Sequence, residues 1–380
     1  MSDSQRCVPT LRTARTTCSH APLSLPSLLL PPSLSFVGKK VVEHRGAMVL
    51  SHPMEHGSVR NWSEMELVWR HCFQELGGGS PRASEARPVL LTVAPRTPRA
   101  AREAAAQVLF EALRAPALHL APTSTLALYA TGRTTGLVLE CGEGVTAATP
   151  VYEGFALPHA QVAAGYGGGE VTRELSVQLR RAGVAFTTTA DMEAVRGLKE
   201  SAAYVALDPA KAEALARDAP SSSSSSGGGS SSAAAAAAAA GEYYTLPDGS
   251  RLKVGVELFR APELLFNPAL AGSEEPGVAA CVGAAVAQCD MDLRRAQLSS
   301  IVLAGGSTAL RGFPQRLLAE VRRLAPPEAK VAVWAPAERK VLTWVGGSIL
   351  ASLSTFRSMW VTREQWEEEG PDALHRRGAL

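Results

Sequence analysis

Two glycine-rich turns, each placed after an apolar run, constrain this chain more than any other feature of its sequence. Residues 136–140 lead into Cys141-Gly142-Glu143-Gly144, and residues 300–303 lead toward Gly305-Gly306-Ser307. Short apolar runs bounded by glycine are typical of buried strands. Glycine leaves the backbone amides uncovered, so that phosphate oxygens can approach them. Taken alone, each turn is more often a simple connection between strands.

Strands and helices alternate along most of the chain. Asn61, with Glu64 three positions later, predicts a helix start, and Trp62, Met65 and Trp69 then repeat at helical spacing. Similar signals predict helices at 98–113, 170–181, 191–206, 313–324 and 348–360, and strands at 89–93, 145–148 and 331–334. This alternation predicts an α/β fold with helices on the faces of its sheets.

Composition narrows the classes of function. The 380 residues have room for two core-bearing lobes, and a net charge of +2 gives no electrostatic reason to expect a nucleic-acid partner. The six cysteines have no metal-ligand spacing and are interpreted as reduced thiols. Prolines interrupt the apolar stretch 23–36, so we expect neither membrane insertion nor an export signal. Residues 221–240 are low-complexity serine, glycine and alanine, and are expected to be a dispensable insertion.

Other chemistry-bearing residues have ordinary structural explanations when each is taken alone. Lys199-Glu200 fits a solvated helix face, and a lone histidine such as His56 is more often structural than catalytic. Gly167-Gly168-Gly169 does not follow a strand, as a dinucleotide fingerprint does. No Ser/His/Asp or Cys/His arrangement for nucleophilic catalysis stands out.

Longer stretches of the sequence resemble the actin family. These stretches are 88–95, 127–136, 142–146, 150–159, 260–263, 303–308, 344–353 and 375–376. The resemblance covers residues 36–380 apart from the insertion. Residues 43–46, 53–57, 263–266, 290–295 and 305–308 resemble the centractin branch of that family, whereas 187–190 and 204–208 are closer to conventional actin.

The resemblance implies a two-lobed fold of the actin and chaperone-ATPase type, with a nucleotide in a central cleft. Residues 36–130 and 342–380 would form the outer lobe, and residues 131–341 the inner lobe. The implied cofactor is ATP or ADP with Mg²⁺ or Ca²⁺. The implied nucleotide-binding residues are Gly142, Glu143, Gly144, Val145, Gly168, Glu170, Lys199, Glu200, Gly305, Gly306, Ser307 and Lys340. Glu140 and Glu143 would lie close to the metal without binding it directly.

The beginning of the chain departs from the family pattern. Residues 1–35 contain neither the Asp-x-Gly-Ser-Gly phosphate loop of the family nor its opening strands, and we expect them to be disordered or wrongly assigned. The N-terminal strands of the outer lobe would then be missing. Strand 89–93 and the hairpin 135–148 would lie beside an absent neighbour, and the protein would be poorly stable.

The residues around the expected phosphates also depart from the family. Glu140 and Cys141 stand where the family has aspartate and serine, and Leu310 replaces a residue that is usually aromatic. The glutamine and histidine that arrange the attacking water correspond to Thr123 and Ala147. Since positioning of that water dominates such catalysis, we expect ATP hydrolysis far below that of an intact actin.

Three functions follow from these expectations. The first is a centractin-like subunit that self-associates into a filament, joins other dynactin-type subunits, needs a chaperonin to fold, and resides in the cytoplasm and cytoskeleton. The second is a divergent conventional actin with ATPase activity. The third is a truncated actin-like remnant without independent function.

Overall fold

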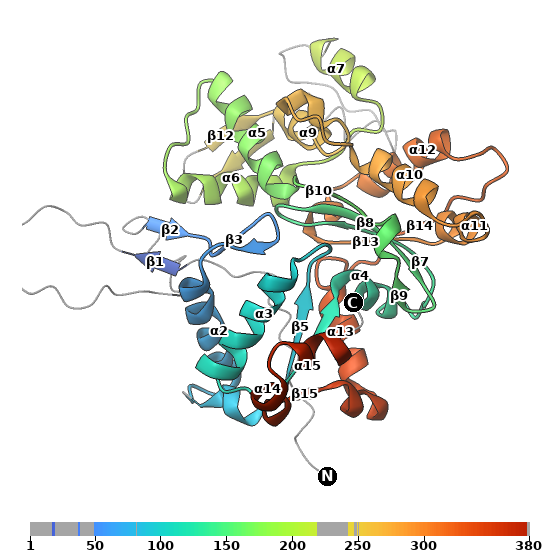
Figure 1. Cartoon of the computed structure of the whole chain (residues 1–380). Helices are drawn as coiled ribbons and strands as arrows, with labels where there is room; N and C mark the ends of the chain where they lie inside the picture. The colour runs from blue at the N-terminus through green and yellow to red at the C-terminus, as the bar shows by residue number, and fades with distance from the viewer. Residues whose placement is uncertain are drawn as a thin grey trace, which may run out of the picture.

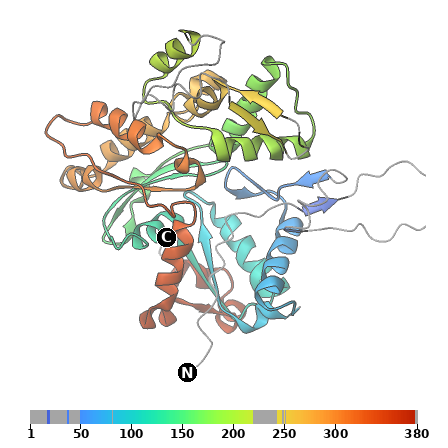
Figure 2. The same cartoon turned by 180° about the vertical axis from the view of Figure 1, so that it is seen from behind.

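A computed structural model describes residues 17–19, 37–38, 49–80, 82–218, 242–246, 249 and 251–377. These residues form two lobes, one above the other in Figure 1 and in the view from behind in Figure 2. The lower lobe in Figure 1 holds the blue, cyan and red segments, and the upper lobe holds the green, yellow and orange ones. The predicted α/β class is confirmed. The predicted insertion 221–240 lies outside the described residues.

The larger sheet carries the first glycine-rich turn. Its strands are ordered β10-β8-β7-β13-β14, and β9 pairs with β8. β7 is antiparallel to β8 and parallel to β13, and every residue of β7 and β13 is buried, which explains their nearly continuous apolar sequences. The strands are β7 (Gly136–Cys141), β8 (Thr146–Tyr152), β9 (Phe155–Ala156), β10 (Val162–Ala164), β13 (Ile301–Ala304) and β14 (Val333–Trp334).

The smaller sheet belongs to the lower lobe of Figure 1 and has the strand order β15-β6-β5. β5 (Val89–Val93) is parallel to β6 (Ala117–Pro122), and β15 (Val361–Thr362) is antiparallel to β6. Within the described residues, β5 pairs with no other strand. The remaining strands form antiparallel pairs: β1 (Thr17–Ser19) with β2 (Val49–Ser51), β3 (Met54–Glu55) with β4 (Ser58–Val59), and β11 (Glu242–Thr245) with β12 (Arg251–Val254).

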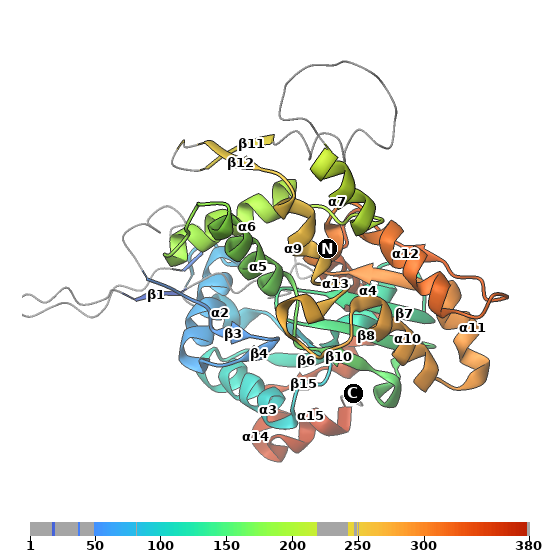
Figure 3. The same cartoon turned by 90° about the horizontal axis from the view of Figure 1, so that it is seen from above.

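Helices cover both sheets (Figure 3). No helix in the described part of the chain combines the length and the apolar character that crossing a bilayer requires. The α-helices are α2 (Trp62–Leu76), α3 (Arg99–Gln107), α4 (Thr123–Tyr129), α5 (Gly168–Arg181), α6 (Thr189–Ala202), α7 (Pro209–Asp218), α9 (Glu257–Glu263), α10 (Val278–Gln288), α11 (Met291–Ser299), α12 (Phe313–Leu324), α13 (Leu342–Ser352), α14 (Arg363–Glu369) and α15 (Asp372–Arg377). A π-helical turn, Val108–Ala112, continues α3.

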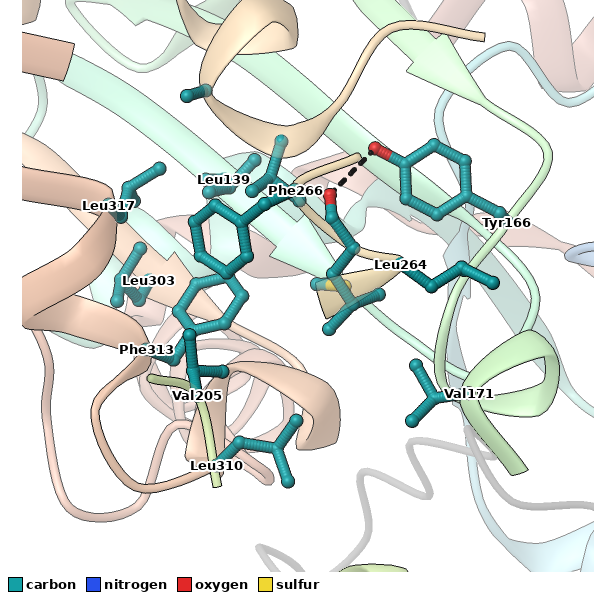
Figure 4. Close-up of a cluster of buried hydrophobic side chains, with 14 of the residues drawn as sticks. Leu139, Tyr166, Val171, Val205, Leu264, Phe266, Leu303, Leu310, Phe313 and Leu317 are labelled. Atoms are coloured by element: carbon teal, nitrogen blue, oxygen red, sulfur yellow. Dashed lines mark hydrogen bonds between the residues drawn. The ribbon is translucent and has the colours of Figure 1, made fainter. Parts of the chain in front are cut away.

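Each lobe has its own main cluster of buried side chains. In the upper lobe of Figure 1, Phe266 and Phe313 meet with ring centroids 5.3 Å apart, and Leu303 and Tyr166 lie nearby (Figure 4). The lower cluster gathers side chains from α2, α3, α14 and the smaller sheet, among them Met65, Trp69, Phe110, Leu118 and Trp366. Two separate cores fit the expected two lobes, although the predicted boundaries between lobes stay a prediction.

Several local predictions are confirmed to the residue or nearly so. β5 occupies 89–93 and α12 occupies 313–324, as predicted. The strand–turn–strand unit at 136–148 forms β7 and β8, and α5 covers the predicted 170–181. In these places the local pattern and the long-range packing favour the same structure.

Two helix predictions are wrong in their boundaries. The helix predicted at 191–206 ends at Ala202, because the next residues pair with the loop before α12, where the Val205 amide donates to Arg311 O at 2.7 Å. The helix predicted at 348–360 is α13, which begins at Leu342 and ends at Ser352. Gly346 lets this helix pack closely on α4, since a Cβ there would lie only 1.7 Å from Leu126 O.

The expected gap beside the hairpin 135–148 is also wrong. β7 lies between β8 and β13, and β8 lies between β7 and β10, so both strands of the hairpin are paired on both sides. The hairpin belongs to the larger sheet, which does not depend on the strands that were expected to be missing. Several elements were not predicted, among them β6, α4 and α10. Pro116 precedes β6 and Pro122 is its last residue, and prolines in a sequence favour the prediction of a loop over that of a strand.

Candidate functional site

The turn between β7 and β8 exposes backbone amides. It is closed by a hydrogen bond of 2.9 Å from the Gly142 amide to Val145 O. The amides of Glu143 and Gly144, between these two residues, donate to no group within the described residues. Free amides in such a turn are suited to bind an anion. The turn therefore has unpaired amides where the resemblance implies a phosphate loop, and its role in binding stays a prediction.

The N-terminus of α5 packs directly onto this turn. The Gly168 amide donates to Gly142 O at 2.9 Å, and the Gly169 amide donates to Glu143 O at 2.7 Å. A Cβ on Gly167 would lie 2.6 Å from Gly142 O, so a side chain there would push the two segments apart. The glycine run at 167–169 thus serves this close approach, which its sequence context alone did not reveal.

The second glycine-rich turn lies beside the first. Ser307 Oγ donates to Gly142 O at 2.8 Å, and Gly305 has a φ of 92°, which favours glycine. A Cβ on Gly305 would lie 2.3 Å from Cys141 O. The parallel pairing of β7 with β13 places the carboxyl ends of the two strands together, and the two turns meet there.

Lys199 reaches the same place from α6. Its side chain is 8% exposed, and its Nζ donates to Gly168 O at 2.6 Å and lies 3.9 Å from Glu143 Oε2. Burial is the largest influence on Lys199 and lowers the pKa of its ammonium group, against the opposing charges of Glu143 and Glu200. A Cβ built on Gly168 would meet Ser307 Oγ, Lys199 Nζ and Glu143 Oε2 within 3.3 Å, so these groups converge on one spot.

Other predicted site residues lie around this centre with partners of their own. Glu170 caps α5, because its Oε2 accepts from the Gly167 amide at 2.8 Å, and it also pairs with Arg173. Lys340 Nζ donates to Glu200 Oε2 at 3.3 Å, and the Lys340 stem lies beside Gly306. Burial favours the neutral form of Glu200, yet Lys340 brings its pKa below the ordinary value.

Glu140 is buried at the end of β7. Its Oε2 accepts a hydrogen bond of 2.5 Å from Thr123 Oγ1, and across the ladder it faces Ala147, which is also buried. The described residues contain no group of three or more His, Cys, Asp or Glu side chains that could hold a metal ion. Glu140 and Glu143 therefore do not build a protein cage for a metal, and a divalent ion here would have to be held through phosphate oxygens and water.

The cysteine in the first turn is not a reactive group. Cys141 is fully buried, its Sγ lies 3.2 Å from Thr146 Oγ1, and burial raises the pKa of its thiol to about 11. Within the described residues, Cys72, Cys141, Cys281 and Cys289 are free, as the sequence predicted.

Sequence reasoning missed one contact of this site. His56, interpreted from sequence as a structural residue, sits in the β3–β4 turn with its Nδ1 3.0 Å from Gly144 O. Gly57 approaches the same loop, since a Cβ there would lie 3.0 Å from Val145 Cγ2. The two residues are 88 positions apart in the sequence, so no local sequence pattern could have predicted this contact.

The chain is similar to known proteins over most of its length. A family model described as Actin matches residues 8–379 of the chain. An "Actin-like protein" of Neurospora crassa is 46% identical over 344 residues, which cover 90% of this chain and 85% of that protein.

Proposed function

The chain belongs to the actin family, and from this premise we propose that it is a nucleotide-binding filament subunit of the centractin-like branch whose ATP hydrolysis is very slow. The family is cytoskeletal and cytoplasmic, and its members bind ATP or ADP with a divalent cation and self-associate. Within this proposal the chain assembles head to tail, since heterologous contacts that do not close produce filaments. Its other partners would be dynactin-type subunits and a folding chaperonin.

One observation carries the nucleotide part of the proposal: Lys199 Nζ and Ser307 Oγ converge beside Gly168, next to the first turn, whose Glu143 and Gly144 amides donate to no group within the described residues. These are hydrogen-bond donors on one side of a shared space, and donors of this kind suit phosphate oxygens. Gly142, Gly144 and Gly168 would line the phosphates, and Lys199 would supply a positive charge. Bound ATP would bring the phosphoanhydride bond that the family hydrolyses.

The slow hydrolysis follows from two residues near Glu140. The Thr123 hydroxyl is already bound to Glu140 Oε2, and the Ala147 methyl has no hydrogen-bonding group. Neither side chain can hold and orient an attacking water. Because water positioning and charge stabilisation supply most of the catalysis in this reaction class, their loss predicts binding with little turnover.

The centractin-like branch is supported by the sequence stretches 53–57 and 290–295. The first includes the β3–β4 turn, which contacts the phosphate-side loop through His56. The second covers the Asp290 cap and the start of α11. The relative from Neurospora crassa carries the description "Actin-like protein", which suits an actin-related subunit.

Binding of fluorescently labelled ATP to the full chain tests the proposal, with Lys199→Gln as the site variant and Lys330→Gln, an exposed lysine outside the site, as control. We expect binding by the parent and the control and a loss of about tenfold or more in Lys199→Gln, since hydrogen bonds to charged groups are worth roughly 1.5–3 kcal/mol. Ser307→Ala provides a milder second variant.

Phosphate release and sedimentation separate the competing functions. We expect release near the blank and pelleting of nucleotide-loaded protein at rising concentration. Sustained phosphate release would instead assign a conventional actin-like ATPase. Absence of both nucleotide binding and pelleting in a folded protein would assign a remnant without function.

A further inference from the structure

A groove on the lower lobe lies outside the nucleotide site. It runs between α3, with its π-helical continuation, and α14, and has a volume of about 620 Å³. Figures 1 and 3 both show α3 beside α14 and α15, which places the groove on one outer face of this lobe. None of its lining residues belongs to the two glycine-rich turns or to their neighbours.

The floor of this groove is apolar. Phe110 from the π-helical turn and Trp366 from α14 stack with centroids 5.2 Å apart at an angle of 22°. Ala100 and Ala104 line the α3 wall, and their small side chains leave space that larger ones would fill. Phe110 is 1% exposed and Trp366 9%, so the stack supports the groove from beneath, and Ala100, Ala104 and the edge of Trp366 offer apolar surface to a partner. An apolar pocket of this kind is the usual setting for an anchor side chain.

Contacts of the C-terminal helix α15 join it to the α3 wall of the groove. Arg99 from α3 lies 3.1 Å from Asp372 of α15, and Glu103 lies 2.9 Å from His375. α15 follows α14 after the turn at Gly370, so these contacts tie the C-terminal helices to α3. The groove is therefore formed before any partner arrives, which reduces the entropic cost of binding.

The rim of the groove is acidic. Glu103, Glu111 and Glu367 line it; Glu103 is paired with Arg99 and His375, and Glu367 with Arg363, whereas no cation pairs with Glu111 within the described residues. The exposed side of α14 adds further carboxylates: Glu364, Glu368 and Glu369. The whole chain has a net charge of +2, so this concentration of negative charge is local to the groove.

We infer that this groove docks a basic amphipathic helix of a partner protein, with apolar side chains against Ala100, Ala104 and Trp366 and lysines or arginines against the acidic rim. Helices bind grooves through anchors spaced three and four residues apart. The α3 wall with its continuation has 14 residues, or about 21 Å at ~1.5 Å per residue, which matches about four turns of such a helix. Charge complementarity excludes nucleic acid and favours a cationic segment.

A synthetic helical peptide tests the inference by fluorescence anisotropy with the full chain. The probe has leucines at i, i+3, i+4 and i+7 and lysines elsewhere, and the comparison peptide has glutamates in place of the lysines. We expect the lysine peptide to bind more tightly than the glutamate peptide by at least tenfold at low salt. Equal affinity for the two peptides would overturn the role of the acidic rim.

Two variants with matched controls locate the binding. Ala100→Trp fills the groove and should weaken the lysine peptide by at least tenfold, whereas Ala280→Trp on the exposed side of α10 should not. Glu111→Lys should weaken it by at least threefold, whereas Glu328→Lys, on an exposed loop, should not. If both groove variants remain folded and bind the peptide as the parent does, the groove is not the docking site. Glu111→Lys changes only a surface charge, so it decides the question even if Ala100→Trp fails to fold.

Discussion

The His56 imidazole lies against the phosphate-side turn, with its Nδ1 3.0 Å from Gly144 O. His56 occupies the left-handed region with a φ of 45°, a conformation that costs energy in a residue with a side chain. The β3–β4 turn is therefore held in a strained shape where it touches the loop that we propose to bind phosphates. A shift of that loop would therefore displace the β3–β4 turn directly.

Replacing Gly144 with alanine should separate these two segments. The new Cβ would lie 3.0 Å from His56 Cα and 3.1 Å from its amide nitrogen, which are backbone atoms that cannot rotate away. We expect a loss of about 1–3 kcal/mol in the free energy of unfolding, measured by urea denaturation. Gly142→Ala is the matched control within the same turn, since its nearest contact is an ordinary 3.5 Å to Val145 O. Equal stability of the two variants would show that the His56 contact tolerates displacement.

The elements that sequence predicted best are those whose signals are local. α12 has an apolar stripe at helical spacing and begins after Gly312, so both ends of 313–324 could be read directly. The predicted start of α2 is also confirmed, because Asn61 Oδ1 accepts a hydrogen bond from the Glu64 amide, as the side chain of a capping residue does. The Glu64 carboxylate, however, accepts from Ser51 Oγ at 2.9 Å. The local sequence pattern could not predict Ser51 as the partner of Glu64.

The candidate site was predictable in its residue types and not in its contacts. The resemblance selected Gly142, Gly168, Lys199 and Ser307, and the structure brings all four together. Helix 191–206 was predicted too long because the competing hydrogen bond of Val205 comes from Arg311, far along the chain. The helix propensity of these residues alone favours a longer helix, and the tertiary hydrogen bond overrides that preference.

Removing the Thr123 hydroxyl should destabilise the end of β7. Thr123 is 3% exposed, and its Oγ1 donates at 2.5 Å to the buried Glu140 carboxylate. Thr123→Val keeps the shape and removes the donor, so we expect a loss of about 1.5–3 kcal/mol. Thr123→Ser keeps the donor and loses one buried methyl, for about 1 kcal/mol. Thermal and urea unfolding of both variants measure the difference, and a valine variant as stable as the serine variant would contradict it.

Acidification should destabilise the lower lobe through His119. This side chain is 7% exposed, and burial lowers the pKa of its imidazole below the ordinary 6.5, although the hydrogen bond to Met359 O opposes the shift. Between the lowered value and 6.5 the unfolded chain binds more protons than the folded one. Stability should therefore fall as the pH drops below 6.5, by about 1.4 kcal/mol for each pH unit within that window.

Urea unfolding of the parent and of His119→Gln between pH 5 and pH 7.5 measures this effect. Glutamine cannot titrate, so the variant should lose part of the pH dependence between pH 5 and 6.5. His159→Gln, at an exposed position, should retain it. A parent and a His119→Gln variant with parallel pH profiles would assign the acid sensitivity to other groups.

Nucleotide affinity should fall at alkaline pH because of Lys199. Burial lowers the pKa of its ammonium group from the ordinary 10.5, and the opposing charges of Glu143 and Glu200 only partly restore it. Once the pH exceeds the lowered value, the affinity for labelled ATP should fall by up to about tenfold per unit and then level off near that of Lys199→Gln, because the neutral amine no longer attracts phosphate. Cys141 does not contribute over most of this range, since its own pKa is raised to about 11.

The sign of this effect is opposite for affinity and for stability. Between the lowered pKa of Lys199 and 10.5, the unfolded chain holds the proton that the folded chain has lost, so folding alone becomes more favourable as the pH rises. A fall in affinity between pH 7 and pH 10 therefore cannot come from unfolding at this residue. Lys199→Arg keeps its charge throughout and should bind labelled ATP with an affinity that changes little over the same range. If the arginine variant loses affinity in parallel with the parent, then another group controls the alkaline limb, and Lys199 is not the phosphate-side cation.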